Sequence, residues 1–472
     1  MSEPTSHSGH RNGGFGSSFG FIIACVGSAV GLGNIWMFPY RLGQYGGAAF
    51  LIPYLFFVLL FGWVGLSAEF GIGRLAGTGT IGAYEYCFAA RGKKKLGGAL
   101  SCLPLMGSLG IAIGYAVILG WVLNSLAGFV SGQLMSADPA PFFQAAASSF
   151  GNPIWHTAVV AVVCLVLIFG VSAGIERVSK VLMPLFFLLF LVLAAWVFTL
   201  PGAGEGYRFL FVPHWEQLLR TETWIMAMGQ AFFSLSITGS GMIVYGAYLK
   251  KDADIPGASL RTAFFDTLAA MLSAVAIIPA VFAYGLDVAR GPSLMFLTLP
   301  AVFQQMPMGQ LFAVILYVAM IFAGVSSLQN MFEAVAESRM HKFPKLSRGA
   351  VLVILCVLCL GFGFTVLRHH AGRGPLFGGG AQRGPVDGLY HHRRGPHRRS
   401  DGRGVRLLCA GLAQAAAGAP AGPEKAHQRR LRRSGPLCLC APDHSCSGPG
   451  LCSGRDRLNS PPRSPEEVIF SL

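Results

Sequence analysis

The chain has 472 residues, of which 53% are hydrophobic and 12% are charged. Soluble globular domains carry about 25% charged residues, so this composition excludes a soluble protein and indicates one that crosses a membrane several times. The net charge of +15 is unevenly spread, because residues 1–366 hold 19 basic and 14 acidic residues while residues 367–472 hold 17 and 7.

Apolar segments of about 18–25 residues recur up to residue 366, and each is long enough to cross a bilayer as a helix. The expected spans are 16–42, 48–74, 97–130, 154–172, 178–200, 223–250, 257–286, 309–338 and 349–366. The six cysteines in this part of the chain have neither the spacing of a metal site nor that of a disulfide framework.

Lysine and arginine concentrate in alternate loops, which predicts the orientation of the spans because positively charged loops stay in the cytoplasm. These loops contain Arg91 with Lys93–Lys95, Arg177 with Lys180, Lys250 with Lys251, and the basic residues from Arg339 to Arg348. The pattern predicts a multi-pass protein of the inner (plasma) membrane with a cytoplasmic N-terminus.

The first span is interrupted at its centre by Gly27, Gly31, Gly33 and Asn34. Glycine costs about 1 kcal/mol per helix position relative to alanine, and a buried amide without a partner costs more. Irregular backbone at membrane depth is tolerated only where protein or a polar cavity surrounds it. The glycines alone are equally compatible with a closely packed neighbouring helix, whereas Asn34 favours a broken helix at a binding site.

The sixth span repeats this interruption, with hydroxyls and glycines between Ser234 and Gly241. Two interrupted helices five spans apart are typical of secondary transporters built from inverted repeats. We therefore expect an all-α polytopic membrane protein with an inverted five-helix repeat and broken helices 1 and 6. A tail (1–14) would precede the first repeat (15–200), and an incomplete second repeat (201–366) would supply helices 6–9, without a tenth.

Five longer motifs support this interpretation: GSAVGLGNIW at 27–36, GIERVSKVLMP at 174–184, GQAFFSLS at 229–236, KKDADI at 250–255 and FAGVSS at 322–327. On these motifs the chain resembles the neurotransmitter:sodium symporter family. Met37 and the pocket described below make it most similar to the bacterial transporters of hydrophobic and aromatic amino acids. The resemblance implies a leucine-transporter-like fold and sodium-coupled import of such an L-amino acid. It also implies alternating access, in which spans 1, 2, 6 and 7 rock against the rest. No enzymatic activity is expected, because nothing in the sequence resembles a nucleophile–base pair or a metal triad.

The resemblance implies two sodium sites, and sodium prefers the oxygen ligands that the matching positions supply. The first would use Asn34, Ser234, Asp266 and the Ala29 carbonyl, completed by the substrate carboxylate. The second would use the carbonyls of Gly27, Val30 and Ala323 and the hydroxyls of Ser326 and Ser327. Considered alone, paired serines in a membrane helix would instead bond to carbonyls of their own helix.

The resemblance also implies a substrate pocket. Gly31 stands where amine transporters carry an acidic side chain, so it leaves room for a carboxylate, which Tyr115 would bond. Phe233 would cover the pocket from outside, and Gly239 would enlarge the side-chain subpocket enough for Tyr or Trp. The other lining residues would be Ser28, Ala29, Leu32, Gly33, Ile111, Ser234, Ser236, Ser327 and Met331.

Asp266 is a functional candidate without any comparison, since a carboxylate in a membrane helix costs at least ~2.5 kcal/mol. Beside a sodium ion it would stay ionised. Chloride-dependent members of the family balance sodium with a bound anion, and some bacterial members carry a glutamate where this chain has Ala270. Asp266 would then supply the fixed negative charge, and transport would be chloride-independent.

Two gate positions depart from the family pattern. Met37 replaces the usual extracellular arginine, and Arg11 and Phe15 only approximate the cytoplasmic arginine and tryptophan. Tyr248 matches the cytoplasmic gate of the family.

After Val366 the composition changes abruptly to arginine, glycine, proline, histidine and cysteine. A GC-rich gene read in the wrong frame gives this composition, so we interpret residues 367–472 as an out-of-frame, disordered basic tail that replaces the tenth span onward. An arm that binds nucleic acid or anionic lipid is disfavoured because the tail lacks helical periodicity and interleaved aromatics, and no nucleic-acid partner is expected. The alternative to a symporter is a non-transporting sensor or an inactive truncated product on the same fold.

Overall fold

The computed structural model describes residues 15–148, 152–237, 239–250, 252–286, 288 and 294–370, with side chains up to residue 365. All regular structure in these ranges is helical. Arg11, the rest of the N-terminal tail and residues 371–472 of the basic tail lie outside the described residues, so the frameshift hypothesis stays a prediction.

The helices follow one another with short connections, and those labelled η are π-helical. The first half of the chain forms α1 (Ser18–Ala29), η1 (Gly33–Met37), α2 (Phe38–Gln44), α3 (Ala48–Leu60), η2 (Phe61–Gly65), α4 (Leu66–Ala76), α5 (Thr80–Ala89), α6 (Lys94–Leu100), α7 (Cys102–Val130), α8 (Gln133–Ser136), α9 (Pro139–Ala147), α10 (Pro153–Ile168), η3 (Val171–Glu176) and α11 (Arg177–Phe198). The second half forms α12 (Ala203–Phe211), α13 (Trp215–Leu218), α14 (Thr221–Ser234), α15 (Gly241–Ala247), α16 (Ile255–Ala283), η4 (Leu294–Thr298), α17 (Leu299–Gln305), α18 (Gly309–Lys342) and α19 (Arg348–His370).

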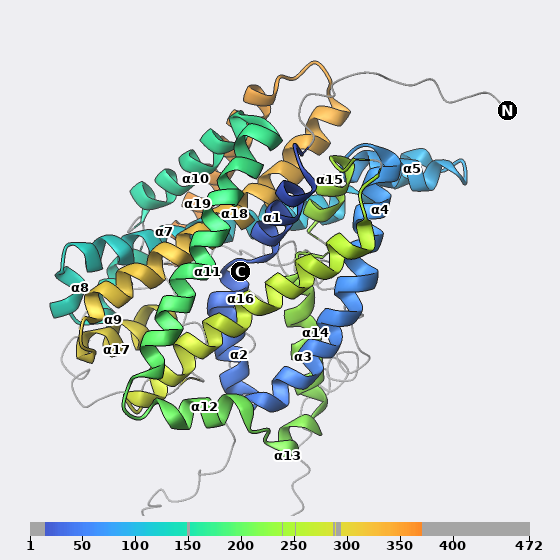
Figure 1. Cartoon of the computed structure of the whole chain (residues 1–472). Helices are drawn as coiled ribbons and strands as arrows, with labels where there is room; N and C mark the ends of the chain where they lie inside the picture. The colour runs from blue at the N-terminus through green and yellow to red at the C-terminus, as the bar shows by residue number, and fades with distance from the viewer. Residues whose placement is uncertain are drawn as a thin grey trace, which may run out of the picture. The chain divides into compact units, whose positions relative to one another are not determined.

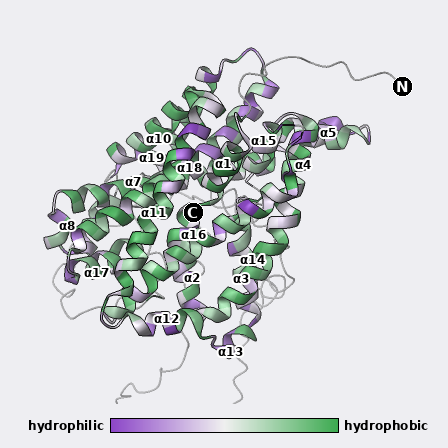
Figure 2. Ribbon diagram, in the orientation of Figure 1, coloured by the Kyte–Doolittle hydropathy of each residue, from purple (hydrophilic) through white to green (hydrophobic). Residues whose placement is uncertain are grey.

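The long apolar helices account for most of the predicted spans. Among the described residues, six helical segments are long and apolar enough to cross a membrane, and α1 with η1–α2 forms a seventh that is bent by 52°. α10 is shorter, and α14 and α15 are separated by the second interruption. Hydrophobic residues run along most of the helices, while hydrophilic residues gather near helix ends such as those of α5, α8 and α13 (Figure 2). Each of the nine predicted segments contains helix, and their number as complete spans stays a prediction.

Both interruptions predicted from the sequence are present. Val30 has extended dihedral angles (φ −69°, ψ 113°), which end α1 at Ala29. Helical hydrogen bonding resumes where the Gly31 carbonyl accepts the backbone N–H of Asn34. Between α14 and α15, Ser236 and Ser240 have φ angles of +54° and +65°. Residues with side chains rarely adopt this left-handed region, so the second break is held in place by its surroundings.

The two broken helices run antiparallel. α1 packs against α15, the second half of the other broken helix, while η1 packs against α14, its first half. In Figure 1, α1 and α15 lie toward one end of the helix bundle and α2 and α14 lie farther toward the other. The unwound segments therefore meet between the four half-helices, as expected for inverted repeats.

Helices α4 and α15 approach closely because glycines replace side chains at their contact. A Cβ on Gly73 would lie 2.0 Å from the Ile243 carbonyl oxygen, and one on Gly246 would lie 2.5 Å from that of Phe70. Small residues let helix backbones touch in this way where no hydrophobic effect drives association. The second half of the broken helix is thus attached tightly to α4.

We expect Gly73→Ala and Gly246→Ala each to destabilise the fold by about 1–3 kcal/mol, because the added methyl group meets backbone that cannot rotate away. Gly71→Ala is the matched control in the same helix, since a Cβ there would have nothing within 4 Å. The check is the midpoint of thermal unfolding in detergent micelles, followed by tryptophan fluorescence. Equal midpoints for the Gly73 and Gly71 variants would contradict the close contact.

Candidate functional site

The break in α1 redirects two backbone groups to other helices. In an unbroken helix the Leu32 N–H would bond to the Ser28 carbonyl. Here the Leu32 N–H donates to the Tyr115 hydroxyl at 2.7 Å. The Ser28 carbonyl instead accepts the hydroxyls of Ser236 at 3.1 Å and Ser327 at 3.0 Å. The break is therefore bonded to α7, to the second break and to α18.

Asn34 joins the first break to α14 and α16. Its Oδ1 accepts the Gly31 N–H at 3.0 Å, and its Nδ2 lies 2.7 Å from Asp266 Oδ1 and 3.1 Å from Ser234 Oγ. Ser234 in turn donates to Asp266 Oδ2 at 2.7 Å. All three side chains are at most 1% exposed. Three residues predicted as ligands of one ion thus form a single buried cluster around a carboxylate.

The chemistry of this cluster suits a hard cation, because an amide oxygen, a hydroxyl and a carboxylate are all oxygen donors. Over the described part of the chain, no three His, Cys, Asp or Glu side chains are grouped to hold a metal ion. The cluster, with its single carboxylate and its oxygen donors, accordingly fits a monovalent cation better than a transition metal.

The residues predicted for a second ion lie where α1 meets α18. A Cβ on Gly27 would lie 3.2 Å from the Ser326 Cβ, so the two residues pack directly. The Ser326 hydroxyl donates to the Phe322 and Ala323 carbonyls at 2.9 and 3.0 Å, which is the bonding within its own helix that paired serines favour. The Ser327 hydroxyl, by contrast, donates to the Ser28 carbonyl of α1.

Several of the predicted substrate residues lie close to the first break, and two of them, Tyr115 and Ser327, lie next to Gly31. A Cβ on Gly31 would lie 2.5 Å from the Tyr115 hydroxyl oxygen and 3.0 Å from Ser327 Oγ, and one on Gly33 would lie 2.8 Å from the Phe233 ring. Among the described residues, an added Cβ at Gly239 would meet only the Ser236 carbonyl, at 3.4 Å. Each of the half-buried residues Ile111 and Met331 lies one helical turn from a site residue: Ile111 from Tyr115 on α7, and Met331 from Ser327 on α18.

Three further polar residues touch this site and were missed by the sequence analysis. Asn330 donates to the Ser28 hydroxyl, Gln230 donates to the Gly33 carbonyl at 3.1 Å, and the buried Tyr54 lies beside Asp266. Asn330 follows Ser327 by three residues and therefore shares its helix face. An amide three residues after Ser327 in an apolar helix could have identified Asn330 from the sequence. Nothing local to Tyr54 distinguishes it from a packed tyrosine.

An ion pair ties the helices together beyond Asn330. Glu333 is fully buried and accepts two hydrogen bonds from Arg348, at 3.1 and 2.5 Å, and one from the Tyr248 hydroxyl at 2.8 Å. The Phe15 ring packs edge-on against Tyr248, with ring centroids 6.4 Å apart. The gate positions Tyr248 and Phe15 thus lie together, and the sequence analysis missed the Glu333–Arg348 pair that holds them to α18 and α19.

Comparisons with known proteins agree with this geometry. The chain matches the sodium:neurotransmitter symporter family over residues 12–138 and 141–374. It is 38% identical to the uncharacterized sodium-dependent transporter YhdH of Bacillus subtilis (strain 168), over 76% of this chain and 80% of that protein. It is 31% identical to the uncharacterized sodium-dependent transporter MJ1319 of Methanocaldococcus jannaschii, over 73% of each chain.

Among solved structures, the crystal structure of MhsT in complex with L-phenylalanine matches with a TM-score of 0.71 and 33% identity, over 86% of each chain. This match confirms the predicted fold class. The chain therefore belongs to the sodium:neurotransmitter symporter family and is a sodium-dependent symporter that crosses the membrane several times.

Proposed function

We propose that this symporter imports hydrophobic or aromatic L-amino acids by alternating access, without a requirement for chloride. The observation that carries the proposal is the buried cluster of Asn34, Ser234 and Asp266 at the meeting point of two broken helices. Secondary transporters place substrate and coupling ions at such a junction. The protein would lie in the plasma membrane with its N-terminus in the cytoplasm.

Two sodium ions would be carried with each substrate. Asn34, Ser234, Asp266 and the Ala29 carbonyl would hold the first, and the carbonyls of Gly27, Val30 and Ala323 with the hydroxyls of Ser326 and Ser327 would hold the second. The Val30 carbonyl is available because the chain leaves the helix at that residue. The substrate carboxylate would lie at Gly31 beside Tyr115 and complete the first ion's shell, which couples the two bindings.

The side chain of the substrate would extend toward Gly239 and Met331. Gly239 contributes no side chain, and an added Cβ there would make only ordinary contact with the Ser236 carbonyl, which supports a large substrate side chain. A flexible methionine adapts to different shapes. The solved neighbour MhsT was crystallised with L-phenylalanine, which supports an aromatic substrate for this chain. We therefore propose leucine, phenylalanine, tyrosine and tryptophan as the substrate class.

The first prediction from this proposed function concerns sodium coupling. The full chain in proteoliposomes should accumulate tryptophan or leucine when an inward sodium gradient is applied, and not with a potassium gradient. Asn34→Ala removes one of the two side chains that donate to the Asp266 carboxylate and leaves the Gly31 N–H without its buried acceptor. The cost of about 1–3 kcal/mol means that half-maximal uptake should need about 5–150-fold more sodium. Sodium-dependent tryptophan binding without uptake would instead identify a non-transporting sensor or an inactive product.

The second prediction concerns chloride. Uptake should continue at the same rate when chloride is replaced by gluconate, because Asp266 already supplies a fixed negative charge beside the ion. Asp266→Asn keeps an oxygen ligand but removes this charge, and its remaining uptake should depend on chloride. Loss of wild-type uptake in gluconate would rule out the assigned role of Asp266.

The third prediction concerns the carboxylate position. Gly31→Ala places a methyl group 2.5 Å from the Tyr115 hydroxyl oxygen, in the space assigned to the substrate carboxylate. Overpacking of about 1–3 kcal/mol should weaken tryptophan binding about 5–150-fold. Gly114→Ala, next to Tyr115 but with nothing within 4 Å of the added Cβ, should bind tryptophan normally. Unchanged affinity in Gly31→Ala would remove the carboxylate from this position.

A further inference from the structure

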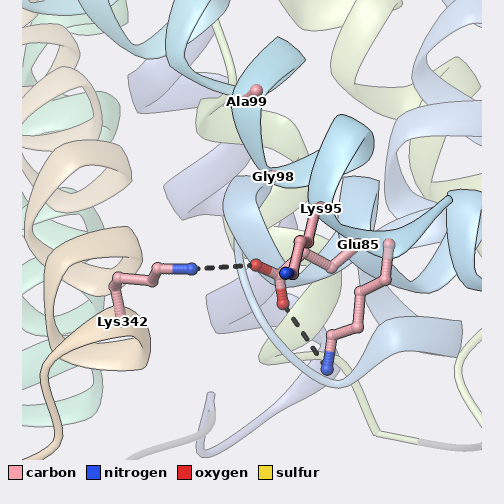
Figure 3. Close-up of a pocket in the computed structure, with 6 residues that line it drawn as sticks. Glu85, Lys95, Gly98, Ala99 and Lys342 are labelled. Atoms are coloured by element: carbon pink, nitrogen blue, oxygen red, sulfur yellow. Dashed lines mark hydrogen bonds and ion pairs between the residues drawn. The ribbon is translucent and has the colours of Figure 1, made fainter.

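A basic pocket lies between α5, α6 and the end of α18, away from the central site. It is lined by Glu85, Lys94, Lys95, Gly98, Ala99 and Lys342 and has a volume of about 440 Å³. Figure 3 shows the Lys342 side chain reaching from α18 toward the Glu85 carboxylate, with Lys95 beside it. Small-molecule sites have volumes of about 300–1,000 Å³, so the pocket has room for a ligand of modest size.

The pocket carries an excess of positive charge. Glu85 Oε1 lies 3.2 Å from Lys342 Nζ, and Glu85 Oε2 lies 3.7 Å from Lys94 Nζ. Lys95 forms no ion pair with any residue in the described ranges. One carboxylate therefore faces three ammonium groups, and an anion in the pocket would balance charges that the protein leaves uncompensated.

The Glu85 carboxylate is itself held in place. Its side chain is only 13% exposed, and a Cβ on Gly98 would lie 2.8 Å from Glu85 Oε1, so α6 closes directly over it. Lys94 and Lys342 are much more exposed, at 69% and 53%. The largely covered Glu85 carboxylate thus pairs with two lysines at the pocket, whose exposed ammonium groups keep further hydrogen-bond donors free for another acceptor.

Apolar side chains continue from the pocket along the same helical segment. Leu96, Leu100 and Leu103 recur at intervals of four and three residues, which places them on one face, and all three are exposed. Lys94–Val130 is a candidate membrane span, and the pocket lies at its first turn. The span predicted from the sequence begins at residue 97, so Leu100 and Leu103 are expected to face acyl chains, with Leu96 at the boundary with the headgroups.

We propose that the basic pocket binds the phosphate headgroup of an anionic glycerophospholipid, whose acyl chains lie along Leu96, Leu100 and Leu103. Lys95 and Lys342 bind the phosphate, and Lys94 remains paired with Glu85. Basic pockets between membrane helices take anionic headgroups because each lysine near the surface contributes to the attraction. A bound lipid would join α6 to α18, the helix that carries Ser326 and Ser327.

The test uses the full chain purified in detergent, with thermal unfolding followed during addition of phosphatidylglycerol, phosphatidylcholine or inorganic phosphate. Phosphatidylglycerol should raise the unfolding midpoint in a saturable way, and the other two should not. Lys95→Gln/Lys342→Gln should weaken the phosphatidylglycerol effect about 25-fold in concentration, which is about five-fold for each lysine. Lys95→Gln alone, which breaks no ion pair, should weaken the phosphatidylglycerol effect about five-fold in concentration.

The matched control is Arg177→Gln/Arg261→Gln, which removes two exposed positive charges near the N-terminal ends of α11 and α16, on the side predicted to be cytoplasmic. It retains the basic tail, as do all the variants, so any general attraction between tail and lipid cancels in the comparison. Equal effects of phosphatidylcholine and phosphatidylglycerol, or equal losses in the two double variants, would overturn the proposal. Stabilisation by inorganic phosphate alone would overturn it in favour of a soluble-anion site.

Discussion

The structure depends on backbone groups that the break in α1 releases where water is scarce. An unbonded N–H or C=O in hydrocarbon costs several kcal/mol, so each must find a partner within the protein. The Leu32 N–H donates to the Tyr115 hydroxyl, and the Gly31 N–H donates to the Asn34 side chain. The Ser28 carbonyl accepts the hydroxyls of Ser236 and Ser327. The hydrogen bonds that satisfy the released backbone groups are consequently the same bonds that assemble the site. This explains why helices distant in the sequence converge there.

Electrostatics then sets what the site can bind. Asp266 is fully buried, and hydrogen bonds from Asn34 and Ser234 stabilise its charged form without neutralising it. Under the proposed function, a substrate carboxylate arriving at Gly31 without a cation would add a second negative charge nearby, which low dielectric makes unfavourable. A sodium ion between the two removes this repulsion. Coupling would therefore follow from charge balance, without a large rearrangement at the site.

The sequence predicted the breaks well because glycines and a carboxamide inside an apolar helix conflict locally with both helix propensity and membrane burial. The motif resemblance added the partners of the breaks, and the structure brings Asn34, Ser234 and Asp266 into contact. Pairings such as Glu333 with Arg348 were not predictable, because they depend on how α18 and α19 turn toward each other. The same holds for the backbone contact between Gly73 and Ile243, which no periodicity reveals.

Two kinds of contact in this fold differ in how easily they separate. Where α15 meets α4, glycines let backbone touch backbone, and separation would leave a void along the interface. Where α1 and the end of α15 meet α18, the links are hydrogen bonds from Ser327 to Ser28 and from Tyr248 to Glu333, which entering water can replace. If spans 1, 2, 6 and 7 move as a unit, the glycine contact lies inside the moving body. The exchangeable hydrogen bonds lie at its boundary, where alternating access requires them.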